Sequence, residues 1–410
     1  MMKLSLGKFG LNHCDLPTMF SNMAVLLRFV TVNIDKKNKK RIPLVFYLIT
    51  TIVVLTYLYA YVFSMLWLVF FRYGKSNIEA ASGALAFCTC SITCMTKFGY
   101  MKFCAKEVCN TVERFLKCDS RVIPGTRFAK NLRKNLRVIK RRATVIWLFL
   151  ISDASIYILI PFLIPGRLFT VEFFIIYGLE PMLETPNYEI ATTASTISVA
   201  FAVYTMVSGA VYVIVIVGYN EAQMYTLSEE LITIWDDSQN FYNHIKHRIT
   251  DNVHDIDIQK KIMNDFIEIR LKDIIRFHIE NISLQHEFDH EIRPIIATEY
   301  FINGICIIAE LLGGLDKTYL QLPYTFVQIA MDCVSGQRLI DACNQFEKTI
   351  YSCKWENFNR TNQRTVLLML MMSQKTLTLS AGGVLKLNFV CLMNILKSTY
   401  STYTTLKSIV

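Results

Sequence analysis

Long apolar blocks that alternate with charged segments constrain this 410-residue chain more than any other feature of its sequence. Most of these blocks are close to the length of about 20 residues that a helix needs to cross a bilayer. Inside a bilayer the backbone must satisfy its own hydrogen bonds, so such blocks are expected to be helical. Charged residues make up 19% of the chain, below the roughly 25% of soluble domains. The sequence therefore predicts an all-α, multi-pass membrane protein.

We predict seven membrane spans. Their approximate bounds are 42–71, 80–101, 143–164, 190–217, 295–312, 319–340 and 382–410. Basic residues gather just before the first span and in the loop 102–142, and the positive-inside rule places both in the cytoplasm. The acidic loop 165–189 is expected outside, as is the C-terminal residue Val410. Because these flanking segments explain the net charge of +10, we do not expect a nucleic-acid partner.

Three further segments are assigned to the cytoplasm: 1–41, 218–293 and 342–381. The second of them is expected to be helical, with Leu284, Phe288 and Ile292 as an apolar stripe at four-residue spacing. Its acidic composition does not conflict with the positive-inside rule, which does not apply to segments longer than about 60 residues. In the third, the apolar run Val366–Met372 is too short to cross a bilayer. We expect it to be an anchor helix in a cytoplasmic bundle.

The last stretch, 380–410, is apolar and long enough to cross a bilayer as one helix, yet it is rich in polar side chains. On a helical wheel one face carries Asn394, Ser398, Ser401, Thr405 and Ser408. Polar groups at membrane depth rarely face lipid, so this face needs water or protein. The residues alone leave two interpretations open: a helix that lines an aqueous path, or a last span that packs through small hydroxyl residues.

Two patterns resemble metal sites but are better explained by structure. Residues 286–290 match the zinc-peptidase pattern H-E-x-x-H, in which two His bind zinc. Asp289 between them and the lack of a good third ligand favour a solvated helix face. Cys88, Cys90 and Cys94 behave as small apolar residues within a span. We therefore expect no metal and no cofactor, and we do not expect an enzyme.

Asp153 is the most notable charge inside a predicted span. A carboxylate at membrane depth is by default a candidate functional residue, and Ser152 and Tyr157 lie nearby on the same helix. The alternative is that a hydroxyl or basic group of a neighbouring helix partners it. Both interpretations stay open.

The last third of the chain resembles an insect odorant receptor. The matching residues are Cys333-Val-Ser-Gly336, Ala342, Ile350-Tyr351, Trp355, Arg364, Leu367 to Met372, Ser373-Gln374-Lys375, Leu377 to Gly383 and Ser398-Thr399-Tyr400-Ser401. The segment 274–292 also resembles the cytoplasmic helix of that family. Gustatory receptors end in TYxxxxxQF, whereas here Thr399-Tyr400 leads to Leu406-Lys407 at the last two positions, which favours the odorant branch.

The resemblance implies an odorant-specific subunit of a heteromeric, ligand-gated, non-selective cation channel in the plasma membrane of sensory neurons. The resemblance also implies a tetramer, in which such subunits assemble with an obligate odorant receptor co-receptor through the cytoplasmic helices. The last span of each subunit would line a central pore for monovalent and divalent cations. The alternatives are a metabotropic seven-span chemoreceptor and a gustatory-type receptor channel.

The resemblance also implies a pocket for a small volatile organic ligand in the outer halves of the second, third, fourth and sixth spans. Candidate ligand contacts chosen from topology are Phe87, Ser152, Asp153, Tyr157, Val199, Tyr204 and Phe326. Candidate pore or gate residues are Thr399, Thr402, Tyr403 and Leu406. Tyr403 lies almost opposite the hydroxyl face of the last helix, so the two faces cannot both point at a pore axis.

Overall fold

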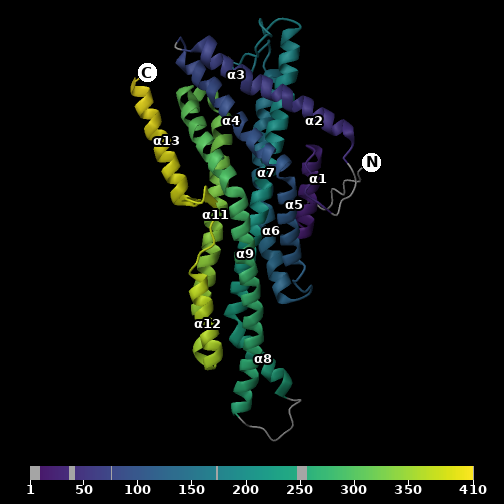
Figure 1. The fold of residues 1–410 in the computed structure, drawn as a ribbon, viewed down its shortest axis with the longest axis vertical. Coiled ribbons are helices and arrows are strands. Elements are labelled where there is room, and N and C mark those ends of the chain that lie inside the picture. Colours follow the sequence, from purple (N-terminus) through teal and green to yellow (C-terminus); the bar gives the residue numbers. More distant parts are fainter. Residues whose placement is uncertain (1–9, 37–41, 75, 172–173, 247–255, 410) are drawn as a thin grey trace.

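The computed structural model describes residues 10–36, 42–74, 76–171, 174–246 and 256–409, and these are mostly helical (Figure 1). The α-helices are α1 (Leu16–Phe29), α2 (Leu44–Tyr57), α3 (Ser64–Trp67), α4 (Ile78–Phe103), α5 (Ala105–Asp119), α6 (Arg127–Leu163), α7 (Asn187–Ile232), α8 (Ile234–Lys246), α9 (Ile256–Leu312), α10 (Leu315–Thr318), α11 (Gln321–Tyr351), α12 (Arg360–Ser373) and α13 (Phe389–Ile409). Shorter elements are the π-helical turns η2 (Leu58–Phe63) and η3 (Leu68–Tyr73), the 3₁₀ turn η4 (Trp355–Asn357), and the strands β1 (Ser380–Ala381) and β2 (Leu385–Lys386).

Side-chain caps set where several of these helices begin. Asn77 accepts a hydrogen bond from the backbone of Ala80 at the start of α4 (3.0 Å). Thr126 does the same for Ala129 at the start of α6 (3.2 Å). Such caps satisfy amide groups that have no partner within the helix.

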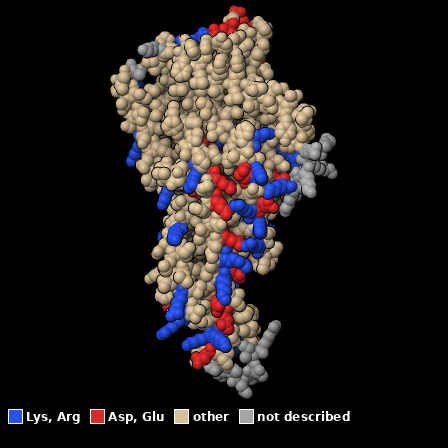
Figure 2. Space-filling model, in the orientation of Figure 1, with Lys and Arg blue, Asp and Glu red and all other residues tan. Residues whose placement is uncertain are grey.

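An apolar band covers the upper part of the face shown in Figure 2, where charged side chains are almost absent below the very top. Among the described residues, five helices are long and apolar enough to cross a membrane: Leu44–Tyr73, α4, α6, α7 and α9. The expected sixth and seventh spans correspond to α11 and α13, which are helical but more polar and are not among those five. The count of seven spans and the orientation of the termini remain predictions.

Helices α7, α9 and α11 continue without a break from the apolar band into the charged lower part (Figure 1). The 57 residues of α9 correspond to about 85 Å of helix. The stripe predicted in this lower part is buried, since Leu284, Phe288 and Ile292 all belong to the main core. The ends of the spans predicted from hydropathy are therefore not the ends of the helices.

The C-terminal stretch is not one helix from residue 380, as we had expected. Strands β1 and β2 pair antiparallel, and Gly382 and Gly383 form the turn between them with φ values of +63° and +75°. Glycine reaches such values at little cost, whereas other residues are strained there. Helix α13 therefore begins only at Phe389, after this hairpin.

The hairpin is held between α9 and α11. The Ser380 amide donates a hydrogen bond to Asp289 Oδ1 (2.6 Å), and the Ser380 hydroxyl bonds the same carboxylate (2.9 and 3.0 Å). On α11, Gly336 lies so close to Leu387 that a Cβ added to the glycine would sit 2.2 Å from the Leu387 carbonyl oxygen. These contacts fix where α13 starts relative to the rest of the chain.

Candidate functional site

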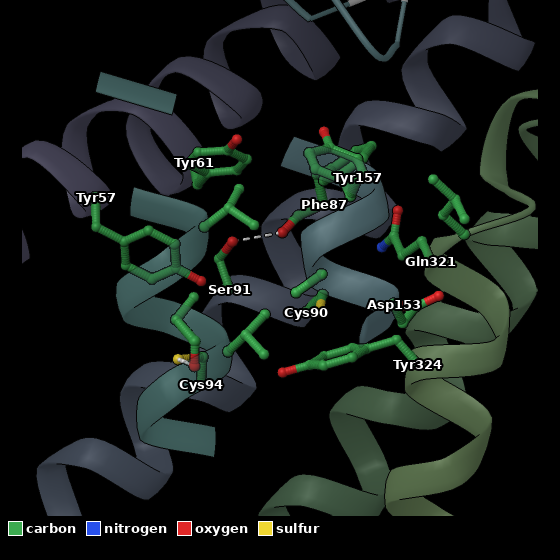
Figure 3. A pocket seen from close by; sticks show the side chains of 15 residues that line it. Tyr57, Tyr61, Phe87, Cys90, Ser91, Cys94, Asp153, Tyr157, Gln321 and Tyr324 are labelled. Atoms are coloured by element: carbon green, nitrogen blue, oxygen red, sulfur yellow. Dashed lines mark hydrogen bonds between the residues drawn. The ribbon is translucent and has the colours of Figure 1, made fainter. Parts of the chain in front are cut away.

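A cavity lies within the apolar band, where α2, η2, α4, α6, α7 and the start of α11 meet (Figure 3). The space between its atoms, including the part that is open to solvent, is about 580 Å³. Its lining includes Tyr57, Tyr61, Phe87, Cys90, Ser91, Cys94, Asp153, Tyr157, Val199, Gln321 and Tyr324. A largely apolar, aromatic cavity with a few polar groups is the usual form of a small-molecule site.

Aromatic rings form much of the wall. The Tyr61 ring lies 5.5 Å from that of Tyr57 and 6.3 Å from that of Phe87, and the Phe87 ring lies 6.2 Å from that of Tyr157. Tyr57 and Tyr61 are four residues apart, which places them on one face of a helix. The π-helical turn η2 begins between them, and such irregular turns are frequent at functional sites.

Two polar groups of the cavity lack a protein partner among the described residues. The Asp153 carboxylate, on α6, has no hydrogen bond and no ion pair with them. Gln321 directs its Nε2 to Cys306 Sγ (3.7 Å), and its buried Oε1 has no partner. By contrast, the Ser91 hydroxyl donates to the Phe87 carbonyl oxygen (2.7 Å). The Asp153 carboxylate is therefore a hydrogen-bond acceptor of the cavity lining that the described part of the chain does not satisfy.

The structure places four of the seven predicted ligand contacts in this cavity. They are Phe87, Asp153, Tyr157 and Val199. The other three are not part of its lining: Ser152 is exposed on α6, Phe326 is 39% exposed on α11, and Tyr204 donates its hydroxyl to the Leu26 carbonyl oxygen of α1 (2.7 Å). Ser152 and Asp153 are adjacent, about 100° apart around the helix, so one faces outward when the other faces inward.

Sequence reasoning missed several residues of the cavity. They are Tyr57, Tyr61, Cys90, Ser91, Cys94, Gln321 and Tyr324. A signal was available for two of them, since Tyr57 and Tyr61 stand four residues apart in the first apolar block. For the thiols we expected packing, and Cys94 does bond within the bundle to the Ala202 carbonyl oxygen (3.2 Å).

Helix α13 packs on the chain through one side only. Thr399 is buried and its hydroxyl donates to the Ile395 carbonyl oxygen (2.9 Å), Ile395 packs against the main core, and Tyr403 on the same side is half-buried. Towards the C-terminal end, Thr402 and Leu406 are exposed. The contacts of α13 are with α9 and α11, along whose edge it lies (Figure 1).

The opposite side of α13 is the predicted hydroxyl face, which we call the hydroxyl stripe. Its members are Asn394, Ser398, Ser401, Thr405 and Ser408, and all five are exposed. The Tyr403 side and the hydroxyl stripe were predicted to be mutually exclusive as pore-facing surfaces. On this chain it is the Tyr403 side that meets neighbouring helices.

Comparison with known proteins identifies this architecture. The sequence profile described as "7tm Odorant receptor" matches residues 77–400. The chain belongs to this odorant receptor family. A comparison with curated proteins gives no match.

The receptor is also similar in fold to the insect olfactory receptor OR5 from Machilis hrabei, with a TM-score of 0.73 and 11% identity. The match covers 96% of this chain and 99% of OR5. The structure of OR5 in complex with eugenol gives the same TM-score and identity. This odorant receptor is thus a multi-pass membrane protein of the same fold.

A buried charge cluster lies below the odorant receptor's cavity, and sequence reasoning missed it. Lys97 Nζ lies 3.1 Å from Glu299 Oε2, and Asp332 lines the same small cavity as both. These three residues come from α4, α9 and α11, so they join three helices inside the bundle. Each is a charged residue within a predicted span, and that was the available signal.

The two motifs that resemble metal sites serve other purposes in the receptor. His286 and His290 are exposed, while Asp289 between them bonds the hairpin through Ser380. Cys88 is buried in the packed core of the upper bundle. Cys90 and Cys94, for which packing was also expected, line the cavity.

Proposed function

We propose that this odorant receptor is the ligand-binding subunit of a non-selective cation channel, opened when a small volatile organic molecule occupies the cavity. The cavity's aromatic lining supports such a ligand, because it offers apolar contact with few polar groups. OR5, a protein with the same fold, has a structure in complex with eugenol. Plasma membrane of a sensory neuron is the location that fits this role.

The observation that carries the channel proposal is the hydroxyl stripe. On a single chain in a bilayer, this exposed row of hydroxyl and amide groups would face hydrocarbon, which is unfavourable. Packing of α13 from several subunits around a central axis would give the stripe water instead. We therefore propose that the hydroxyl stripe, rather than the Tyr403 side, lines the cation path, with Thr402 and Leu406 near its outer mouth.

Assembly with a co-receptor is the second part of the proposal. Helix α12 exposes four large apolar side chains, those of Leu367, Leu368, Met371 and Met372, at 58%, 62%, 58% and 45%. Apolar patches of this kind mark interaction surfaces. Because α12 lies far below the apolar band, the partner would be protein rather than lipid (Figure 1). A tetramer that includes the odorant receptor co-receptor, joined through α12 and α13, accounts for both surfaces.

Helix α11 gives a physical link between ligand and pore. Its first turn supplies Gln321 and Tyr324 to the cavity. Further along, Gln337 Oε1 accepts a hydrogen bond from the Phe389 amide at the start of α13 (3.3 Å). A ligand changes an equilibrium only through different affinities for the two states. We propose that ligand binding favours a position of α11 that moves the start of α13 outward.

Cysteine accessibility tests which side of α13 lines the path. The receptor is co-expressed with the co-receptor, and cation current is recorded against an odorant panel. In Ser401→Cys, a charged thiol reagent applied during odorant should change the current irreversibly, whereas Thr399→Cys, on the buried side two residues away, should not respond. Modification of Thr399→Cys alone, or no current with any odorant, would count against the proposal.

A further inference from the structure

The geometry points to a ligand class for this cavity: a small organic amine in its protonated form, with the Asp153 carboxylate as counter-charge. This inference rests on the proposed function, namely that the cavity is the ligand site. It goes further by naming the chemical group that the site recognises.

The balance of charges around the cavity favours a cationic ligand. Two carboxylates buried in the bundle each have a partner for one oxygen: Glu299 pairs with Lys97 (3.1 Å), and Glu310 accepts a hydrogen bond from the Thr325 hydroxyl (2.7 Å). Asp153 lines the cavity with no such partner among the described residues. A carboxylate in apolar surroundings is unfavourable unless it is paired, hydrogen-bonded or neutralised. A cationic ligand supplies the pairing that the described chain does not.

The hydrogen-bond acceptors of the cavity favour the same ligand. Gln321 is 8% exposed and its Oε1 has no partner, while its Nε2 is directed to Cys306 Sγ. Figure 3 shows Gln321, Asp153 and Tyr324 on one side of the cavity and Tyr57 on the other. A primary ammonium group has three N–H donors, whereas an alcohol has one O–H donor and an ester has none. An ammonium group can therefore pair with the Asp153 carboxylate and still donate to another acceptor of the cavity.

The aromatic wall also favours a cation. Rings of Phe87, Tyr157 and Tyr324 line the same cavity as the carboxylate. The face of an aromatic ring attracts a cation within about 6 Å of its centroid, and it does so more strongly when the site is dry. Carboxylate and rings together stabilise an ammonium head group, and the remaining apolar wall contacts the hydrocarbon or aryl part.

The competing interpretation is a protonated, neutral Asp153 that donates a hydrogen bond. In that case carbonyl compounds such as ketones and esters would be preferred, since they accept but do not donate. Ammonium ligands would then gain nothing over alcohols of the same shape.

Matched ligand pairs separate these interpretations. In cells that express the receptor with its co-receptor, currents are recorded for hexylamine, cyclohexylamine and 2-phenylethylamine, each against the alcohol of the same skeleton, and for 2-heptanone. We expect at least one amine to act at a concentration tenfold or more below its alcohol. Asp153→Asn should remove that preference, while Ser152→Ala, on the exposed side of α6, should keep it.

Four outcomes overturn the inference: equal responses to amine and alcohol, a preference for the ketone, a preference unchanged in Asp153→Asn, or its loss in Ser152→Ala. Any of them, with robust currents from neutral odorants, leaves the proposed function standing. Absence of current and of ligand-induced thermal stabilisation across a broad odorant panel would overturn the proposed function as well.

Discussion

Replacement of Gly336 by Ala tests how the chain positions its last helix. Gly336 belongs to the Cys333–Gly336 motif and lies in the interior of α11. A Cβ added there would lie 2.2 Å from the carbonyl oxygen of Leu387 and 3.1 Å from its carbonyl carbon. The nearest obstacle is backbone, so no side-chain rotation relieves the contact. The segment that leads into α13 must move away from α11 by roughly 1 Å to restore ordinary contact.

The size of the effect follows from two opposing contributions. Ala in place of Gly favours a helix by about 1 kcal/mol. An added group in a tightly packed site costs about 1–3 kcal/mol, and the contact with backbone argues for the upper end. The net loss is then about 2 kcal/mol, which corresponds to about 2 °C in the apparent melting temperature of a chain of this length.

Gly304→Ala is the matched control. Gly304 also lies inside a long helix, α9, but nothing lies within 4 Å of a Cβ added there. Both variants would be purified in the same detergent and melted while the folded fraction is followed by size-exclusion fluorescence. We expect Gly304→Ala to match or exceed the wild type and Gly336→Ala to fall below it, with smaller odorant-evoked currents. Equal melting temperatures for the two variants would refute the reasoning about this contact.

Three further predictions follow from the buried and exposed groups. Lys97→Met leaves the carboxylates of Glu299 and Asp332 without their cation, so we expect the free energy of unfolding to fall by about 3–5 kcal/mol. Glu299→Gln in the same chain should recover part of this loss. Burial lowers the pKa of His278, in the part of α9 below the apolar band, to about 4. Between about pH 6.5 and 4 the unfolded chain then binds more protons than the folded one, so the free energy of unfolding falls as the pH drops. His278→Phe should weaken this dependence, measured as the difference in melting temperature between pH 5 and pH 7. Replacing Leu368 and Met371 on α12 by Glu should reduce co-purification with the co-receptor without lowering the subunit's melting temperature.

A specific result would contradict each of these three expectations. No rescue in the Lys97 and Glu299 double variant would mean that the two groups do not act as a pair. A His278→Phe protein that loses stability in acid as much as the wild type would assign the dependence to other groups. Normal co-purification of the α12 variant would place the subunit interface elsewhere.

The helical, multi-pass architecture was predictable because its causes are local. Apolar length and the lack of partners for the backbone in lipid require helices. The stripe of Leu284, Phe288 and Ile292 was predictable for a related reason, since in an aqueous setting the buried side of a helix differs in polarity from the exposed side. The resemblance in residues 333–401 agrees with the family match over residues 77–400.

The side of each membrane helix that faces the cavity was not predictable in this way. Lipid tails are as apolar as a protein core, so a spanning helix carries apolar residues on both sides. Helices α6 and α7 are similarly apolar, yet few residues of the α6 span are buried and most of those in α7 are. Sequence reasoning therefore proposed both Ser152 and Asp153 as ligand contacts. Only the packing of α6 shows that Ser152 is exposed and that Asp153 lines the cavity.

The last helix shows the same division. Its row of hydroxyl residues, and their need for water or protein, followed from the sequence alone. That α13 starts at Phe389 depends on contacts with residues far away in the sequence, namely Asp289 on α9 and Gly336 on α11. Those contacts also turn the Tyr403 side inward and leave the hydroxyl stripe exposed. The sequence by itself determined what α13 carries, and the tertiary structure decided which way it faces, because helix rotation is set by packing between distant segments.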